Sequence, residues 1–174
     1  VFIRPIRMTD EPSLREMFYA LSEDTIYHRF FHALRTMPHV RLQEFLRTDY
    51  DRQMVLVATP DKGEGQPIVA VARYDLDRRT NLAEVAFVVR DEWQGRGLGT
   101  DLLAAITETA REHGIGGFTA SVLADNVAML RVFHQASPAV ESRLDGGTYE
   151  LTIRFPGASS PAGTGQRVPA TEGD

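Results

Sequence analysis

The stretch from residue 82 to residue 113 constrains the fold more than any other part of the sequence. It opens with LAEVAFVV, which is apolar enough for a buried strand, and ends with apolar residues at helical spacing over about 98–113. Between them lies WQGRGLGT, which holds three glycines within five residues. Because glycine loses more conformational freedom than other residues on folding, the cluster indicates a tight turn or a backbone that approaches something closely.

Short strands and amphipathic helices are predicted on both sides of this unit. The predicted strands are FIRPIR (2–7, an edge strand), MVLVAT (54–59), PIVAVARY (67–74), LAEVAFVV (82–89), FTASVL (118–123) and a pair around the turn at 145–147. The predicted helices cover about 9–21, 24–33, 38–47 and 98–113, and a further one starts near 126. This mixture predicts an α/β (α+β) sandwich around one sheet.

Bulk properties bound the class of protein. The 174 residues, 43% of them hydrophobic, suit one domain over 1–155, and the Gly-, Pro- and Ser-rich remainder at 156–174 is predicted to be a disordered tail or linker. No apolar run approaches the roughly 20 residues that span a bilayer. The net charge of -5 argues against non-specific nucleic-acid binding. We therefore expect a cytoplasmic location with no membrane and no nucleic-acid partner.

Two further compositional features bear on function. The chain has no cysteine, which excludes disulfides, thiolate metal ligands and a cysteine nucleophile. It begins with Val1 rather than methionine, which is consistent with a domain cut from a longer protein.

The glycine cluster has a chemical interpretation and a plain one. A glycine-rich loop before a helix presents unpaired N–H groups at the positive end of the helix dipole, where a diphosphate can bind. Gly95, Gly97 and Gly99 leave room for such a group, and Thr100 adds a hydroxyl. The alternative is an ordinary strand-to-helix turn. The spacing fits neither the Rossmann nor the Walker motif, which disfavours a dinucleotide or a nucleoside triphosphate.

Residues 94–99, QGRGLG, match the Q/R-x-x-G-x-G/A signature of the GNAT N-acetyltransferases, and the chain resembles that family over about 2–155. LAEVAFVV looks like the family's fourth strand, ADNVAMLRVF like its Asn-containing helix, and RPIRMTDEPSL like its opening strand and helix. The resemblance implies a mixed, mostly antiparallel central sheet with helices on both faces. YHRFF, DYDRQMVLVA and AEVAFVV look more narrowly like the Pat-type protein-lysine acetyltransferases, whose GNAT domains are often fused to acyl-CoA synthetase-like or CoA-transferase-like domains.

The resemblance also implies acetyl-CoA as co-substrate. Successive loop amides would hold its pyrophosphate, and the exposed edge of the fourth strand would pair with the pantetheine. Asn126 would hydrogen-bond the pantetheine arm, while helix capping is a second role compatible with the first. The cofactor-binding residues are then Phe87, Val88, Val89, Gln94, Gly95, Arg96, Gly97, Leu98, Gly99, Thr100, Asn126 and Phe133. Arg96 has the alternative of pointing into water.

Glu84 is the candidate catalytic residue, because it interrupts the apolar run 82–89. Burial among apolar neighbours disfavours the charged form of a carboxylate, which suits a base that works near neutral pH. The alternative is a structural glutamate paired with Arg73 or Arg90. The resemblance implies that Glu84 is the general base, often acting through a water molecule.

The remaining catalytic groups are less clear from the sequence. The oxyanion is expected to meet a backbone N–H near Val88 or Val89, since no side chain there can donate. Many family members carry a proton-donating tyrosine where this chain has Phe133. Water or another group then protonates the thiolate, or the thiolate leaves unprotonated, which a thiol pKa near 8.5 tolerates.

His28 and His32 stand four residues apart, as in zinc-binding helices, but Arg29 takes the place of the glutamate in H-E-x-x-H. We therefore expect no metal site, and we expect Phe30 and Phe31 to pack this helix onto the sheet, with its outer part bordering the acceptor groove.

The leading hypothesis is direct transfer of acetyl from acetyl-CoA to a protein lysine, with an acyl-CoA synthetase as one candidate acceptor. The first alternative is the same chemistry on a small-molecule amine. The second is a non-catalytic domain that senses acyl-CoA and regulates a fused partner.

Overall fold

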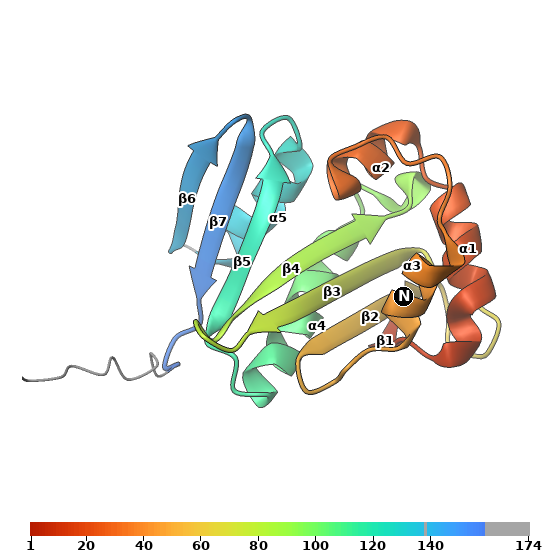
Figure 1. Cartoon of the computed structure of the whole chain (residues 1–174), viewed down its shortest axis with the longest axis horizontal. Coiled ribbons are helices and arrows are strands. Elements are labelled where there is room, and N and C mark those ends of the chain that lie inside the picture. The colour runs from red at the N-terminus through yellow and green to blue at the C-terminus, as the bar shows by residue number, and fades with distance from the viewer. Residues whose placement is uncertain (138, 159–174) are drawn as a thin grey trace, which may run out of the picture.

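The structure is a computed structural model that describes residues 1–137 and 139–158. Within these ranges, seven strands form one sheet in the order β1-β2-β3-β4-β5-β7-β6 (Figure 1). The strands are β1 (Phe2–Pro5), β2 (Gln53–Thr59), β3 (Ala70–Asp77), β4 (Leu82–Val89), β5 (Gly117–Leu123), β6 (Val140–Asp145) and β7 (Thr148–Arg154). Every neighbouring pair is antiparallel except β4 and β5, which are parallel. The predicted mixed, mostly antiparallel sheet is confirmed.

Helices cover both faces of the sheet, as predicted (Figure 1). They are α1 (Glu11–Tyr19), α2 (Glu23–Phe30), α3 (His39–Leu46), α4 (Leu98–Glu112) and α5 (Val127–Ala136). Alternation along the strands separates two apolar clusters: Val55 and Val57 of β2 pack with α1–α3, whereas Met54 and Leu56 pack with α4 and α5.

Element boundaries differ most from the predictions at two places. β3 begins at Ala70 rather than at residue 67 and continues to Asp77, because its second half keeps pairing with β4 as far as Leu82. α2 ends at Phe30 rather than near residue 33, because Phe31 adopts a left-handed conformation with φ 61°. The prediction that Phe31 packs onto the sheet is wrong, since its side chain is 41% exposed.

Two further predictions concern the C-terminal tail and membrane-spanning segments. The predicted tail at 156–174 lies, from residue 159 onward, outside the described residues. No helix in the described part of the chain is both long and apolar enough to cross a bilayer.

Candidate functional site

β4 and β5 diverge soon after they begin. They pair only from Leu82↔Gly117 to Glu84↔Thr119, and beyond Glu84 the two strands separate like the arms of a V (Figure 1). A cleft of about 430 Å³ lies where the strands separate. It is lined by β4, β5, α2, α5 and the glycine loop, the name used here for residues 94–100. Its volume is in the range of small-molecule sites. Backbone groups of β4 that face β5 without bonding to it can form hydrogen bonds with a ligand.

The alternation of backbone groups decides which amides face the cleft. The Arg90 N–H donates to the Val69 carbonyl at 2.9 Å on the β3 side, so the Val88 amide two residues earlier also points toward β3. Phe87 and Val89 therefore present their backbone N–H groups to the open edge. The Val88 N–H, one of the two predicted donors to the oxyanion, points away from the cleft. The Phe87 N–H joins the Val89 N–H as a candidate donor.

The glycine loop is shaped by backbone conformations that favour glycine. Gly95 has φ +70° and Gly97 has φ +83°, and a Cβ at either position would meet no atom within 4 Å. Gly97 is the N-cap of α4, so the free N–H groups of that helix start here. Both glycines line the cleft. The open space beside Gly95 and Gly97, at the N-terminus of α4, is called the cradle below. It fits the diphosphate of coenzyme A.

The other residues of the loop have different surroundings. A Cβ at Gly99 would lie 3.5 Å from Val132 of α5, so this glycine allows α4 and α5 to pack closely. Leu98 is buried beneath the loop, and Thr100 is exposed on the cleft wall. The Arg96 guanidinium lies 5.3 Å from the Trp93 ring centre, and Arg96 does not line the cleft.

Glu84 lies where β4 and β5 separate, and its side chain lines the cleft. It is exposed rather than enclosed by apolar groups, so the expected desolvation is absent. Its register partner on β3 is Asp75, another acidic residue. The structural pairings weighed for Glu84 are also absent, because Arg73 pairs with Asp75 at 3.7 Å and Arg90 pairs with Glu92 at 2.7 Å.

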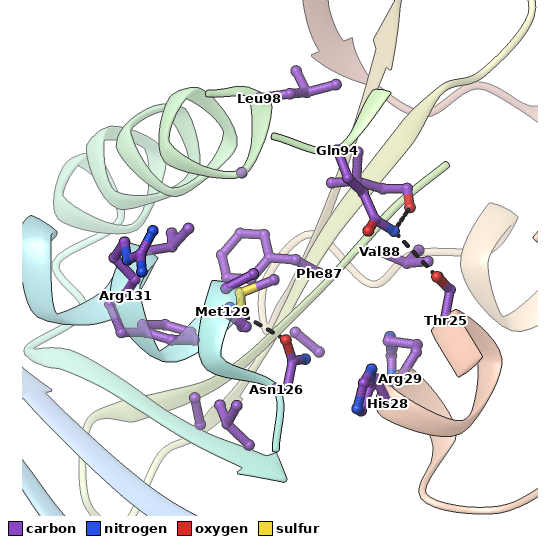
Figure 2. A pocket seen from close by; sticks show the side chains of 18 of the residues that line it. Thr25, His28, Arg29, Phe87, Val88, Gln94, Leu98, Asn126, Met129 and Arg131 are labelled. Carbon is purple, nitrogen blue, oxygen red and sulfur yellow. Dashed lines mark hydrogen bonds between the residues drawn. The ribbon is translucent and has the colours of Figure 1, made fainter. Parts of the chain in front are cut away.

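Asn126, seen in Figure 2, lines the cleft at the start of α5. Phe133, within α5, lines it as well. The Asn126 Oδ1 accepts a hydrogen bond from the Met129 N–H at 3.2 Å, which confirms the capping role and leaves the amide nitrogen for a ligand. Phe133 is 1% exposed, and its ring centre lies 5.8 Å from that of Phe87. It forms an apolar inner wall for the cleft.

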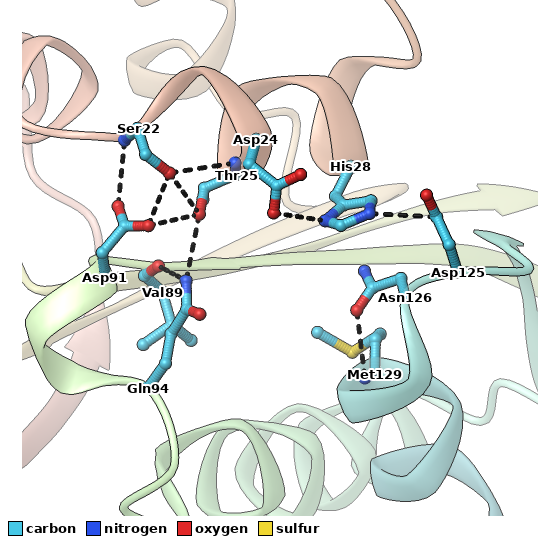
Figure 3. A network of polar contacts seen from close by, with 10 residues as sticks. All are labelled: Ser22, Asp24, Thr25, His28, Val89, Asp91, Gln94, Asp125, Asn126 and Met129. Atoms are coloured by element: carbon cyan, nitrogen blue, oxygen red, sulfur yellow. Dashed lines mark hydrogen bonds and ion pairs between the residues drawn. The ribbon is translucent and has the colours of Figure 1, made fainter.

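A polar network fixes α2 beside the cleft (Figure 3). Asp91 accepts hydrogen bonds from the Ser22 N–H at 2.9 Å, the Ser22 hydroxyl at 2.6 Å and the Thr25 hydroxyl at 2.8 Å. The Gln94 amide donates to the Thr25 Oγ1 at 3.1 Å and to the Val89 carbonyl at 3.0 Å. Although burial opposes ionisation of Asp91, the hydrogen bonds from Ser22 and Thr25 hold its pKa below the usual value. Gln94 therefore positions the loop against β4 and α2.

Near the C-terminal end of α2, the His28 side chain connects this helix to the loop before α5. Its Nε2 lies 3.0 Å from Asp125 and its Nδ1 lies 3.4 Å from Asp24 (Figure 3). His32 does not line the cleft, and no group of three potential metal ligands occurs within 1–137 and 139–158.

Sequence reasoning missed several residues that line the cleft. Thr25, His28 and Arg29 come from α2, and Arg131 comes from α5 (Figure 2). No local pattern marks them, because α2 reaches the cleft through contacts with residues more than 60 positions away.

Known proteins match both the sequence and the fold. A model described as the Acetyltransferase (GNAT) family matches residues 15–136. Acetyltransferase Pat of Mycolicibacterium smegmatis is 32% identical over 156 residues, which are 89% of this chain but 46% of that protein. The chain thus spans about half of that relative's length.

Solved structures agree with this match. The GNAT domain of S. lividans PAT is 31% identical with a TM-score of 0.78, over 88% of this chain and 89% of that domain. A Salmonella typhimurium acetyltransferase solved with acetyl-CoA shares the fold at 20% identity, with a TM-score of 0.68 over 92% of this chain and 98% of that one. With the open β4 edge and the glycine cradle at its centre, this chain belongs to the GNAT acetyltransferase family.

Proposed function

We propose that this domain transfers an acetyl group from acetyl-CoA directly to a lysine ε-amine of a protein, with an acyl-CoA synthetase as the first acceptor to examine. The similarity to Acetyltransferase Pat supports a protein acceptor. The cradle at Gly95 and Gly97 suits the diphosphate, and the open edge at Phe87 and Val89 suits the pantetheine amides.

The reaction needs a neutral amine, and Glu84 is the group placed to provide it. Removing the proton from a lysine at pH 7 costs about 4.6 kcal/mol. A positioned base contributes on the order of 10²- to 10⁴-fold in rate. Since Glu84 is exposed at the mouth of the cleft, an acceptor amine or a bridging water can reach its carboxylate.

The rest of the chemistry falls to the backbone and the cleft walls. An N–H on the open β4 edge, at Phe87 or Val89, would donate to the developing oxyanion. Phe133 has no proton to give, so the proposed route lets the thiolate leave unprotonated or take a proton from water. The chain has no cysteine, which favours direct transfer over a cysteine acyl-enzyme.

The observation that carries the proposal is the position of Glu84, which makes no ion pair within the described ranges 1–137 and 139–158, where the open edge of β4 begins. We therefore expect Glu84→Gln to lower kcat at least about tenfold while the affinity for acetyl-CoA, measured by calorimetry, stays close to wild type. Glu108→Gln is the matched control, because Glu108 is exposed on α4 away from the cleft.

Three outcomes would contradict parts of this proposal. Full turnover by Glu84→Gln removes Glu84 from the mechanism. Mass spectrometry that detects labelled polyamines but no labelled proteins shows a small-molecule acceptor. Absence of turnover in the wild-type chain with bound acetyl-CoA favours a regulatory domain.

A further inference from the structure

Arg29 places a positive charge at the cleft. It lies in the last turn of α2, lines the cleft together with Glu84, and reaches from α2 toward β4 (Figure 2). Within 1–137 and 139–158, neither Arg29 nor Glu84 makes an ion pair. Two opposite charges therefore face one cavity, both free to bind a ligand.

The surroundings of Arg29 are unfavourable for an unpaired cation. Arg29 is half-buried, and its side chain borders a small apolar pocket. A compensating contact comes from the Phe30 ring, which has its centre 5.0 Å from the guanidinium and attracts it weakly. Burial lowers the pKa of Arg29 to about 10, and the charges of Arg73 and Arg41 add to this effect, while Glu84 opposes it. Arg29 remains protonated at pH 7. A half-buried cation with cationic neighbours gains most when an anion comes to it.

Most carboxylates near Arg29 already have partners in the protein. Asp24 and Asp125 both contact His28. Asp75 accepts a hydrogen bond from Gln53 at 2.6 Å and also pairs with Arg73. Glu84 is the exception, and its charge supports that of Arg29 across the cleft. Because Glu84 is the base proposed for the acceptor amine, a ligand is the better source of an anion for Arg29.

The coenzyme diphosphate is a poor candidate for that anion. The glycine loop contacts the start of α2, where Asp91 and Gln94 bond to Ser22 and Thr25. Arg29 lies seven residues after Ser22, about 10 Å further along the helix axis. It therefore stands beyond the loop, at the end of α2 that is remote from the cradle.

We propose that Arg29 binds a carboxylate of the acceptor, an aspartate or glutamate next to the lysine whose ε-amine reaches Glu84. This inference rests on the function proposed above. A segment that carries both a lysine and a neighbouring acid matches the two unpaired charges of the cleft. An arginine also holds a carboxylate in a bidentate geometry, which gives such a pair directional specificity. Acceptor choice then depends on the residues that flank the lysine.

The test uses pairs of lysine peptides that differ only by Asp or Asn at one position, from two residues before the lysine to two residues after it. The ratio of kcat/KM for each pair is measured in the wild type and in Arg29→Gln, Arg29→Lys and Arg47→Gln. Arg47→Gln is the control, since it removes the same charge from an exposed site outside the cleft. Each ratio compares two peptides with the same enzyme preparation. Unfolded enzyme lowers both kcat/KM values equally, so it does not change the ratio.

We expect the wild type to prefer the Asp peptide at least about tenfold at one or more positions, mainly through KM. Arg29→Gln should bring that ratio close to one, Arg29→Lys should give an intermediate ratio, and Arg47→Gln should keep the wild-type ratio. Equal rates on Asp and Asn peptides at every position overturn the carboxylate site but leave lysine acetylation standing. A preference that survives in Arg29→Gln also overturns it. Acetylation of no peptide refutes the proposed function and this inference with it.

Discussion

Gly97 allows the cradle at the start of α4 to be tested with one methyl group. Its φ of +83° lies in the left-handed region, where alanine costs about 1–2 kcal/mol. For a chain of this size that corresponds to a drop in Tm of roughly 2–8 °C. The Gly97→Ala methyl group would also stand in the open space beside the loop, where the diphosphate is proposed to lie. We expect the Kd for CoA to rise at least about tenfold, which is about 1.4 kcal/mol.

Gly114 provides a matched control for the backbone effect. It has φ +73°, an added Cβ there also meets no atom within 4 Å, and it follows the opposite end of α4. Gly114→Ala should therefore lower the Tm by a similar amount while CoA binding stays at the wild-type level. The measurements are thermal melts and calorimetric titrations with CoA, both on the two variants and the wild type.

The comparison separates stability from binding. If Gly97→Ala binds CoA as the wild type does, the loop does not hold the diphosphate at this residue. If Gly114→Ala loses affinity to the same extent, the loss follows from destabilisation, and the reasoning about the cradle fails.

Two further predictions concern carboxylates that hold helices in place. Asp10 and Arg4 form a buried pair at 2.7 Å; although burial opposes ionisation of Asp10, the hydrogen bond from Arg4 holds its pKa below the usual value. Asp10→Asn should reduce the free energy of unfolding by about 3 kcal/mol or more above pH 4, and the difference should shrink as the pH falls through the lowered pKa; a constant difference would contradict this. Asp91→Ala removes the acceptor for Ser22 and Thr25, so hydrogen exchange should accelerate in α2 and stay unchanged in α4. Unchanged protection of α2 would show that Asp91 does not anchor it.

Local sequence patterns were sufficient for the elements at the centre of the site. β4 spans Leu82–Val89, as the apolar run predicts, and α4 begins at Leu98 directly after the glycines. The glycine cluster predicted a tight turn or a close backbone approach, and Gly95 and Gly97 have left-handed conformations there. These features depend on steric rules and periodicity within a few residues, which a sequence displays directly.

The surroundings of individual side chains could not be predicted in this way. Glu84 lies in an apolar run, yet it is exposed at the last residue of β4 that pairs with β5, opposite Asp75 of β3. In the sequence, Arg29 is notable only for standing where a zinc helix would have glutamate. The contacts that place its helix at the cleft come from distant residues, among them Asp91, 69 positions after Ser22.

The sequence by itself determined the strand, the glycine turn and the helix that follows it, since each depends on short-range sterics and on the period of its apolar residues. Only the tertiary structure decided that β4 and β5 separate after Glu84, which β4 amides face the gap, and which charges lack partners. These properties depend on strand register and on contacts between distant segments, where one residue of displacement turns a side chain or an amide to the opposite side.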